Sequence, residues 1–388
     1  MDLPPELFLI LANLLDVEDT ANFLGTSKTL ARHFSSLLLP LRTSNNESIL
    51  TGAVILKNRE LVDVLLDSGA DANIQDDLHG MSALHHAALV GDPIMVNLLL
   101  KAGANPNVTG TAGCTPLHIA LTPAVIKSIA DAGGEINKKN DDGATPIFWA
   151  ASRGRHEEVT LMLQLGAEVD VKDTDGWTPL HCAAAKGFTE VVKTLMENGT
   201  DGNEADNASL TALHYASFRG HHETVKLLLE NGVKVNATDG TNLTAICGAA
   251  NAGHAEVVKI LLEHKAKAGL ADALFSAAVA GRDDVVGLLL ENNDSSLAAR
   301  VDHALRIAVE RGHTTVVKQL LSQKIDIELT RPLLYAANNN HIEVVKTLLD
   351  SPYNFKKQAQ SYLTLAPSTV NKDVSTLLET YIANTPDE

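Results

Sequence analysis

The chain has 388 residues, of which 45% are hydrophobic and 4% aromatic, and its formal net charge is −17. This length exceeds the roughly 250–300 residues at which a single core stops growing, so it predicts several domains or a repeat array. The apolar content is too high for a chain that is disordered overall. The acidic balance, with no basic stripe to offset it, argues against nucleic acid as a partner.

Three cysteines, Cys114, Cys182 and Cys247, lie far apart in the sequence. This spacing indicates neither a disulfide framework nor a zinc site. A reducing compartment is therefore expected, the cytoplasm, the nucleus or both. The apolar run at residues 7–15 follows acidic residues rather than Lys or Arg, so a signal peptide is not expected. No apolar run approaches the roughly 20 residues of a membrane span, so no membrane partner is expected.

The first predicted element is a helix that begins with a proline-containing segment at residues 3–6. The residues expected to form its contact face are Leu3, Pro4, Leu7, Ile10, Leu11 and Leu14. Further apolar residues lie on its other sides, so the helix is apolar over most of its circumference. A module this small cannot cover that surface itself, which predicts a partner or docking on the rest of the chain. Two more helices are predicted to begin near Asp16 and Ser27.

The pattern Leu-Pro-x-Glu-Leu, continued by the apolar spacing of this helix, Asp19, Phe23-Leu24 and Ser27, resembles an F-box. It departs from that family at its end, where residues 30–33 replace the usual tryptophan and basic residue. The resemblance implies that residues 1–43 hold the Skp-type linker of a cullin–RING ubiquitin ligase. The alternative interpretation is that these helices only cap the repeats that follow, without any link to ubiquitin.

Repeats fill the rest of the chain. A Thr-Pro-Leu-His tetrad or a close variant recurs at residues 82–85, 115–118, 145–148, 178–181, 211–214 and 244–247. A loop glycine, usually followed by histidine or another polar residue, recurs at Gly154, Gly187, Gly220, Gly253, Gly281 and Gly312, and Asn340 later takes its place. The tetrads begin 30 to 33 residues apart. A nearly constant period of this length is the signature of a stacked repeat architecture.

The pattern of each unit predicts two short helices joined by a turn. In residues 173–205, Thr178 is expected to cap the first helix and Pro179 to begin it. Gly187 ends that helix, at a place where a positive φ is needed. The second helix carries an apolar stripe over residues 191–196. Helices this short are not stable alone, so stacking of neighbouring units must supply the stability.

The tetrads, the loop glycines and second helices such as residues 257–262 resemble the ankyrin repeat family. The fold class that this implies is all-α, an ankyrin-repeat solenoid of helix–turn–helix units with hairpin-like connections. About eleven units are expected over residues 44–384, degenerate at both ends, and residues 385–388 form a tail.

Two parts of the array depart from the pattern. The unit that starts at Gly113 is three residues short and lacks its loop glycine, so Thr122 and Pro123 are expected to cap and start its second helix instead. After residue 266 the tetrad disappears, and the resemblance there depends on the second helices and the turns. The final helix is expected over residues 375–382.

Most of the histidines recur once per repeat. One set is His85, His118, His181 and His214, and the other is His156, His221, His254, His313 and His341. Such residues are expected to hold the repeats rather than to form one site, and in the ankyrin family the tetrad histidine bonds turn backbone. Paired carboxylates such as Asp141-Asp142 and Asp283-Asp284 fall in predicted turns. No catalytic or metal-binding motif occurs, so no enzyme, metal or cofactor is expected.

The resemblance further implies that partners contact the turns and the ends of the first helices. The candidates at these positions are His79, Met81, Asp142, Arg153, Asp175, Trp177, Lys186, Phe218 and Arg219. Neighbouring candidates are Leu89, Val90, Ser152, Ala185, Leu210 and Asn251. Aromatic residues and arginine often dominate binding energy; the alternative is that Trp177 and Phe218 only pack between turns. The predicted function is a protein–protein interaction scaffold whose repeats bind a protein target.

Overall fold

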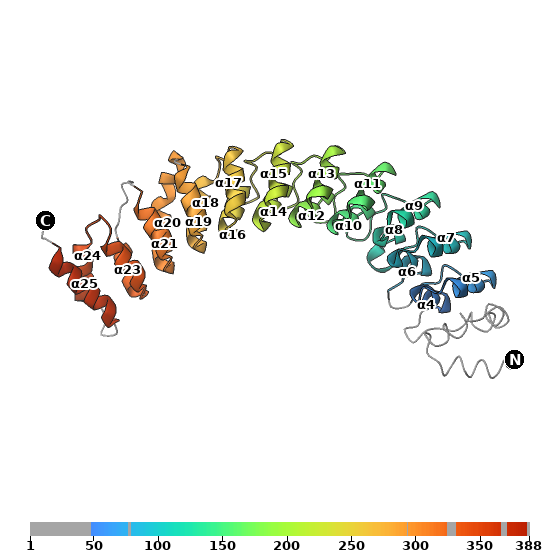
Figure 1. Ribbon diagram of the computed structural model, residues 1–388, viewed down its shortest axis with the longest axis horizontal. Coiled ribbons are helices and arrows are strands. Elements are labelled where there is room, and N and C mark those ends of the chain that lie inside the picture. Colours follow the sequence, from blue (N-terminus) through green and yellow to red (C-terminus); the bar gives the residue numbers. More distant parts are fainter. Residues whose placement is uncertain (1–47, 77–78, 293, 324–330, 366–370, 386–388) are drawn as a thin grey trace, which may run out of the picture. The chain divides into compact units, whose positions relative to one another are not determined.

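The computed structural model describes residues 48–76, 79–292, 294–323, 331–365 and 371–385. These residues form helices and three isolated β-bridges, and no strand occurs among them. The helices follow one another as eleven pairs along the described part of the chain (Figure 1). The all-α prediction is confirmed.

Each pair consists of a first and a second helix. The first helices are α4 (Ile49–Ile55), α6 (Ala83–Val90), α8 (Pro116–Ile119), α10 (Pro146–Ser152), α12 (Pro179–Ala185), α14 (Ala212–Arg219), α16 (Ala245–Ala252), α18 (Leu270–Ala280), α20 (Ala298–Arg311), α22 (Pro332–Asn338) and α24 (Lys356–Leu365). The second helices are α5 (Arg59–Asp67), α7 (Pro93–Lys101), α9 (Pro123–Asp131), α11 (His156–Gln164), α13 (Thr189–Glu197), α15 (His222–Glu230), α17 (Ala255–Glu263), α19 (Asp283–Glu291), α21 (Thr314–Leu321), α23 (Ile342–Leu349) and α25 (Lys372–Asn384). Two 3-10 helices, η1 (Thr111–Gly113) and η2 (Ser295–Leu297), lie between them.

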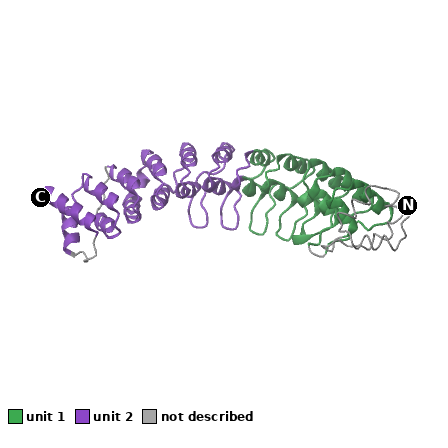
Figure 2. Cartoon of the chain, turned by 60° about the horizontal axis from the view of Figure 1, so that its bottom comes forward, with its two compact units in different colours: residues 1–183, 190–201 green, residues 184–189, 202–388 purple. Residues whose placement is uncertain are grey.

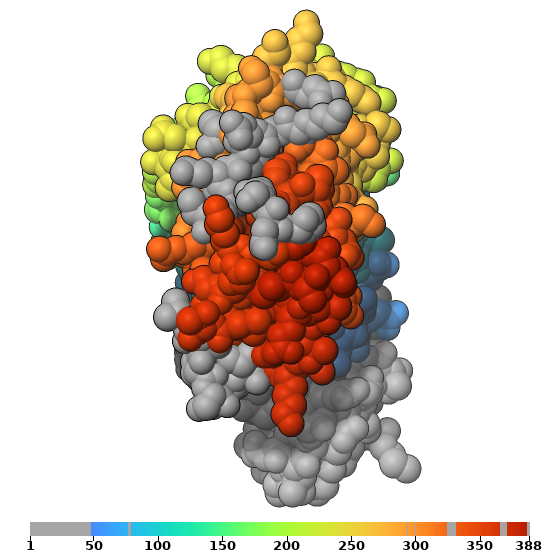
Figure 3. All heavy atoms as spheres, turned by 90° about the vertical axis from the view of Figure 1, so that its left-hand side faces the viewer, coloured from blue at the N-terminus to red at the C-terminus, as the bar shows by residue number. Residues whose placement is uncertain are grey.

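The chain divides into two compact units (Figure 2). Unit 1 comprises residues up to 183 together with 190–201, and unit 2 comprises residues 184–189 together with those from 202 onward. Within each unit, first helices pack on first helices and second helices on second helices: α6 contacts α4 and α8, and α19 contacts α17 and α21. The last pair, α24 and α25, covers the C-terminal end of unit 2 (Figure 3).

The helix boundaries follow from local capping. α9 begins at Pro123, and the Thr122 hydroxyl accepts a hydrogen bond from Val125 N at 3.4 Å, which confirms the start predicted for the short unit. α25 begins before the predicted residue 375, because the Asn371 side chain caps it by accepting from Asp373 N at 2.8 Å. Both are ordinary N-caps, in which a side-chain oxygen accepts from an otherwise unpaired N–H of the first turn.

Asparagine side chains join the loops that follow the second helices of neighbouring repeats. Asn107 Nδ2 donates to the carbonyl oxygen of Gly133 at 2.9 Å, and its Oδ1 accepts from Glu135 N at 2.7 Å. The same pair of bonds is made by Asn73 and Asn137 in unit 1 and by Asn236 in unit 2. One side chain thereby satisfies a donor and an acceptor of the next repeat, where backbone polar groups would otherwise lack partners.

Candidate protein-binding surface

Two tetrad histidines, His85 and His118, use both ring nitrogens to hold the repeats. His85 Nδ1 accepts from Ser82 N at 3.1 Å, and its Nε2 lies 3.0 Å from the carbonyl oxygen of Cys114 in the next repeat. Because Nδ1 is an acceptor, Nε2 carries the proton and donates it to that carbonyl. His118 is bonded in the same way, to Thr115 at 3.0 Å and Ala144 at 3.1 Å. These contacts confirm the structural role predicted for His85 and His118.

The loop histidines bond in the opposite direction, to the preceding repeat. His254 Nε2 lies 3.1 Å from the carbonyl oxygen of Phe218, at the end of the previous first helix. Equivalent pairs are His221 with Ala185 (3.2 Å), His313 with Val279 (3.2 Å) and His341 with Glu310 (2.9 Å). Each of these contacts engages a carbonyl that the end of a helix leaves without an intrahelical partner.

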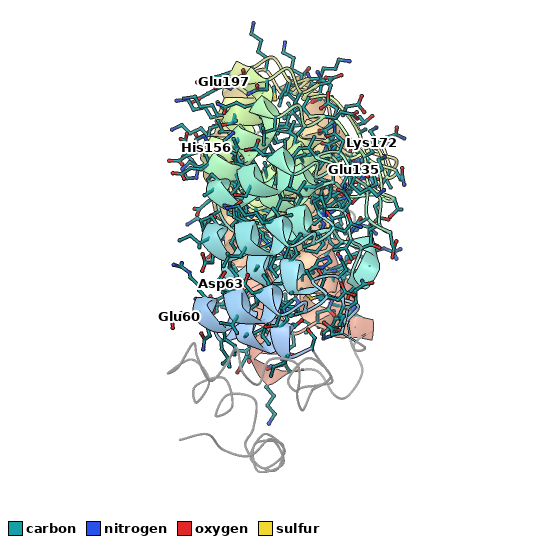
Figure 4. All side chains as sticks on the ribbon, turned by 90° about the vertical axis from the view of Figure 1, so that its right-hand side faces the viewer. Glu60, Asp63, Glu135, His156, Lys172 and Glu197 are labelled. Atoms are coloured by element: carbon teal, nitrogen blue, oxygen red, sulfur yellow. The ribbon has the colours of Figure 1, made fainter. Side chains whose placement is uncertain are left out.

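The assignment of His156 to this second set is wrong. Arg155 occupies the position, and its guanidinium donates to the carbonyl oxygen of Ala120 at 2.9 Å. His156 is the first residue of α11 and is exposed. Figure 4 shows it on the outer side of unit 1, away from Glu135 and Lys172. Imidazole and guanidinium are both N–H donors that reach a carbonyl, so the position relative to the loop glycine identifies the role and the residue type does not.

One tetrad of unit 1 lacks its histidine. Phe148 stands at that position, and the buried hydroxyl of Thr145 has no hydrogen-bond partner among the described residues. In the preceding tetrad the Thr115 hydroxyl lies 2.9 Å from His118 Nδ1. The two threonines therefore have the same place in the repeat and differ in whether their hydroxyl is satisfied.

We expect Thr145→Val to raise the free energy of unfolding by about 1 kcal/mol, because valine keeps the shape and removes a buried, unsatisfied hydroxyl. Thr115→Val should lower it, since that change leaves His118 without the hydroxyl. Urea denaturation of both variants measures the two effects. A loss of stability in Thr145→Val as large as that in Thr115→Val would contradict the difference between the two tetrads.

No group of three or more His, Cys, Asp or Glu side chains among the described residues is arranged to hold a metal ion. The cysteines are free and buried, and burial raises the pKa of the Cys114 and Cys247 thiols. A thiol with a raised pKa is a poor nucleophile. Asp283 and Asp284, predicted in a turn, instead begin α19, where acidic side chains complement the helix N-terminus.

The nine predicted target-binding residues lie on two kinds of segment. His79, Met81, Asp142, Asp175 and Trp177 lie in the loops before first helices, whereas Arg153, Lys186, Phe218 and Arg219 lie at or just after the ends of first helices. All are exposed except Met81 and Trp177, which are half-buried. Lys186, Phe218 and Arg219 belong to unit 2 and the other six to unit 1, so each unit carries its own surface.

Hydrogen bonds between neighbouring loops bring the loop candidates of unit 1 into one row. They run from Thr111 Oγ1 to the carbonyl oxygen of His79 (2.5 Å), from Asp141 N to that of Ala112 (2.9 Å) and from Thr174 N to that of Asp142 (2.8 Å). Asp142 and Asp175 are exposed at adjoining loops. The loop edge of unit 1 thus offers carboxylates at fixed spacing to a partner.

Trp177 lies against its own repeat. Its backbone N–H donates to Asp173 Oδ1 at 2.8 Å, and its ring centroid is 6.2 Å from that of His181. The ring is half-buried, so part of its surface packs inside the fold and part remains accessible. The packing of Trp177 against its own repeat agrees with the second interpretation, and its role in partner binding stays a prediction.

Sequence reasoning does not identify Trp149, which lies beside a predicted residue. The guanidinium carbon of Arg153 is 4.4 Å from the centroid of the Trp149 ring, a cation–π arrangement. Partial desolvation lowers the pKa of Arg153, and its guanidinium forms no ion pair with the residues that the structure describes. Arg153 is the C-cap of α10 and follows Trp149 by four residues, a spacing that brings two side chains to the same helix face and could have identified the pair.

Unit 2 presents a second aromatic–arginine pair. Phe218 is 47% exposed at the end of α14, and the Arg219 guanidinium carbon lies 5.8 Å from its ring centroid. Leu243, which was not predicted, is 39% exposed in the following loop. Exposed aromatic and arginine side chains are the residue types that often anchor protein interfaces.

The F-box-like residues Leu3, Pro4, Leu7, Ile10, Leu11 and Leu14 lie outside the described residues, as do the whole 1–43 module and residues 386–388 of the tail. Their assignments remain predictions. Within the described part of the chain, every helix is too short or too polar to cross a lipid bilayer.

Comparison with known proteins identifies the repeat. The family model "Ankyrin repeats (3 copies)" matches residues 50–123, 122–206, 165–239, 213–300 and 293–361. The chain is similar to E3 ubiquitin-protein ligase KEG of Arabidopsis thaliana, with 34% identity over 102 residues, 26% of this chain and 6% of that protein. It is also similar to the putative ankyrin repeat protein FPV031 of fowlpox virus, with 30% identity over 159 residues, 39% of this chain and 47% of that protein.

Among solved structures, the ankyrin repeat domain of Bcl-3 matches with a TM-score of 0.49 and 28% identity, over 55% of this chain and 97% of that chain. The chain spans less than half the length of the two curated relatives, the ubiquitin-protein ligase KEG and FPV031. The family model, by contrast, covers most of the chain, from the second residue of α4 to α24. Proteins of this fold are typically non-catalytic. The chain belongs to the ankyrin repeat family and is a protein–protein interaction scaffold.

Proposed function

We propose that this scaffold is a non-catalytic, substrate-recognition adaptor of a cullin–RING ubiquitin ligase. Residues 1–43 bind the Skp-type linker, and the repeats bind the protein that is to be ubiquitinated. The observation that carries the proposal is the F-box-like pattern that begins at Leu3-Pro4, placed before an array of ankyrin repeats. The similarity of the repeats to part of a protein named as a ubiquitin ligase is consistent with it.

The surface of the repeats supports the target-binding half of the proposal. Exposed arginines lie against Trp149 in unit 1 and Phe218 in unit 2, and such aromatic and arginine side chains often act as binding anchors. The carboxylates of Asp142 and Asp175 lie on adjoining loops. Since the linker-binding role belongs to a different segment, one chain can bind both partners at once. The adaptor works in the cytoplasm, the nucleus or both, which microscopy of a fluorescently tagged chain would test.

The linker-binding half is tested by Leu7→Asp combined with Leu11→Asp in the full chain. We expect this double variant to lose capture of a Skp-type linker and a cullin, because two charges on the apolar contact face remove the hydrophobic contribution to binding. Affinity purification followed by mass spectrometry gives the readout. Asn13→Asp, which adds a charge to the same segment at a polar position, is the matched control and should retain the linker.

The helical circular dichroism of the repeats should be the same in all three chains. Equal capture of the linker by the double variant would overturn the F-box assignment. Absence of linker and cullin from every sample would leave the simpler alternative, in which the chain is an ankyrin scaffold whose N-terminal helices only cap the repeats.

A further inference from the structure

α16 contains a glycine that the fold itself does not require. Gly248 lies in the middle of this helix, where glycine lowers helix stability relative to alanine. A Cβ added there would meet Phe218 Cβ at 3.5 Å and Phe218 Cδ2 at 3.8 Å, which are ordinary van der Waals distances. The backbone of Gly248 is helical and needs no positive φ. Alanine would therefore fit and would strengthen the helix.

The neighbouring repeat has a large side chain at the same position. Tyr215 lies five residues before Gly220, as Gly248 lies five residues before Gly253. The Tyr215 ring is half-buried, and its hydroxyl donates to Asp206 Oδ2 at 2.5 Å. Gly248 has no side chain, so at this position the backbone of α16 is bare, and the exposed Phe218 side chain lies beside it. Because glycine has no Cβ, it allows a ligand to approach the backbone closely.

Polar groups of defined kind surround this bare backbone. Arg219 is exposed, its guanidinium carbon is 5.8 Å from the Phe218 ring centroid, and it forms no ion pair within the described ranges. Asn251 is exposed one helical turn after Gly248 and has an amide that both donates and accepts hydrogen bonds. A guanidinium without an ion-pair partner, beside an exposed aromatic ring, favours a ligand with a carboxylate.

We propose that Phe218, Arg219, Gly248 and Asn251 form a docking site for a peptide segment of the partner protein, in which an aromatic or large aliphatic residue is followed within two positions by Asp or Glu. The apolar side chain lies on the bare backbone at Gly248, against the Phe218 ring. The carboxylate pairs with Arg219, and Asn251 bonds the peptide backbone. Consecutive Cα atoms of a peptide are about 3.8 Å apart. The 5.8 Å between the Phe218 ring centroid and the Arg219 guanidinium carbon therefore matches a peptide whose apolar and acidic residues are one or two positions apart.

This inference rests on the proposed binding of a protein target by the repeats, and it names the chemistry of that target. The test uses the full chain and an array of synthetic nine-residue peptides with Gly-Ser flanks. The central residues combine Leu, Phe or Trp with Asp or Glu, and a matched set has Lys in place of the acid. We expect at least tenfold tighter binding of the acidic set, measured by fluorescence anisotropy.

Gly248→Tyr copies the side chain of the preceding repeat and should weaken binding of the acidic peptides at least tenfold, because the tyrosine ring occupies the peptide's place. Arg219→Glu should reverse the preference in favour of the Lys set. Gly287→Ala is the control, since Gly287 is also a glycine inside a helix without a positive φ, and α19 is a second helix. It should leave peptide binding unchanged.

Equal binding of the acidic and Lys sets, or unchanged binding by Gly248→Tyr, would overturn the proposal. If Gly248→Tyr fails to fold, Phe218→Ala removes an exposed side chain and tests the same contact, with a tenfold loss again expected. Linker capture distinguishes this proposal from the adaptor role. Gly248→Tyr should retain the Skp-type linker, whereas the Leu7→Asp and Leu11→Asp variant should lose the linker and still bind the acidic peptides.

Discussion

Acidification from pH 7 to pH 4 will lower the free energy of unfolding, by about 3 kcal/mol at His118 alone. Burial lowers the pKa of this imidazole from 6.5 to about 4, and its side chain is only 2% exposed. The folded chain keeps it neutral while the unfolded chain takes up a proton, so the unfolded state binds more protons between pH 6.5 and 4. The free energy of unfolding therefore falls as the pH falls through this window.

The hydrogen bonds explain why the folded state resists the proton. His118 Nδ1 accepts from Thr115 N, so a proton there would face another donor. Burial also lowers the pKa of His85 and His214, which act in the same direction. Urea denaturation at a series of pH values measures the slope, and His118→Gln should be less stable at pH 7 but less sensitive to acid. An identical slope in this variant would show that His118 does not contribute.

Gly220→Ala will destabilise the protein more than Gly232→Ala, although the two glycines have nearly the same backbone conformation. Their φ values are +80° and +79°, so alanine costs roughly 1 kcal/mol at both for its left-handed conformation. A Cβ at Gly220 would lie 2.6 Å from His254 Nδ1, whereas one at Gly232 meets nothing within 4 Å. Displacing the His254 ring should cost about a further 1–3 kcal/mol.

This pair of variants isolates the contact between repeats from backbone strain. Native-state hydrogen exchange is the suitable measurement, because repeat arrays need not unfold in one step. The amides of α14 and α16 should lose protection in Gly220→Ala and much less in Gly232→Ala. Equal losses would mean that the ring moves aside without cost and that the loop glycine is needed only for its φ.

The fold can be predicted from the sequence because each repeat contains residues that mark where its helices begin and end. Thr122 and Pro123 mark the start of α9 even where the loop glycine is missing, since a cap and a proline act locally. The end of the array is less exact: α25 is longer than expected at both ends, because Asn371 caps it and no glycine stops it before Thr385.

The binding surface is less predictable, because it depends on which residues of different repeats become neighbours. Position in the repeat identifies Arg153 and Phe218 as surface residues, and helical spacing would have added Trp149. Nothing in the sequence near Gly248 shows that Phe218 lies beside it, since the two residues are 30 positions apart. His156 lies one residue beyond the position that bonds the preceding repeat, so distance from the loop glycine predicts the role and the presence of a histidine does not.

The direction of the histidine bonds determines how far an event at one repeat is felt. His85 and His118 bond the following repeat and the loop histidines bond the preceding one, so each of these hydrogen bonds joins nearest neighbours. Coupling along such an array is short-ranged, because each repeat contacts only its nearest neighbours. A ligand held at Phe218 will therefore restrain α14 and α16 most, and its influence will decay with every further repeat of unit 2. Distant repeats of the same unit can thus be occupied, altered or unfolded with little effect on that ligand.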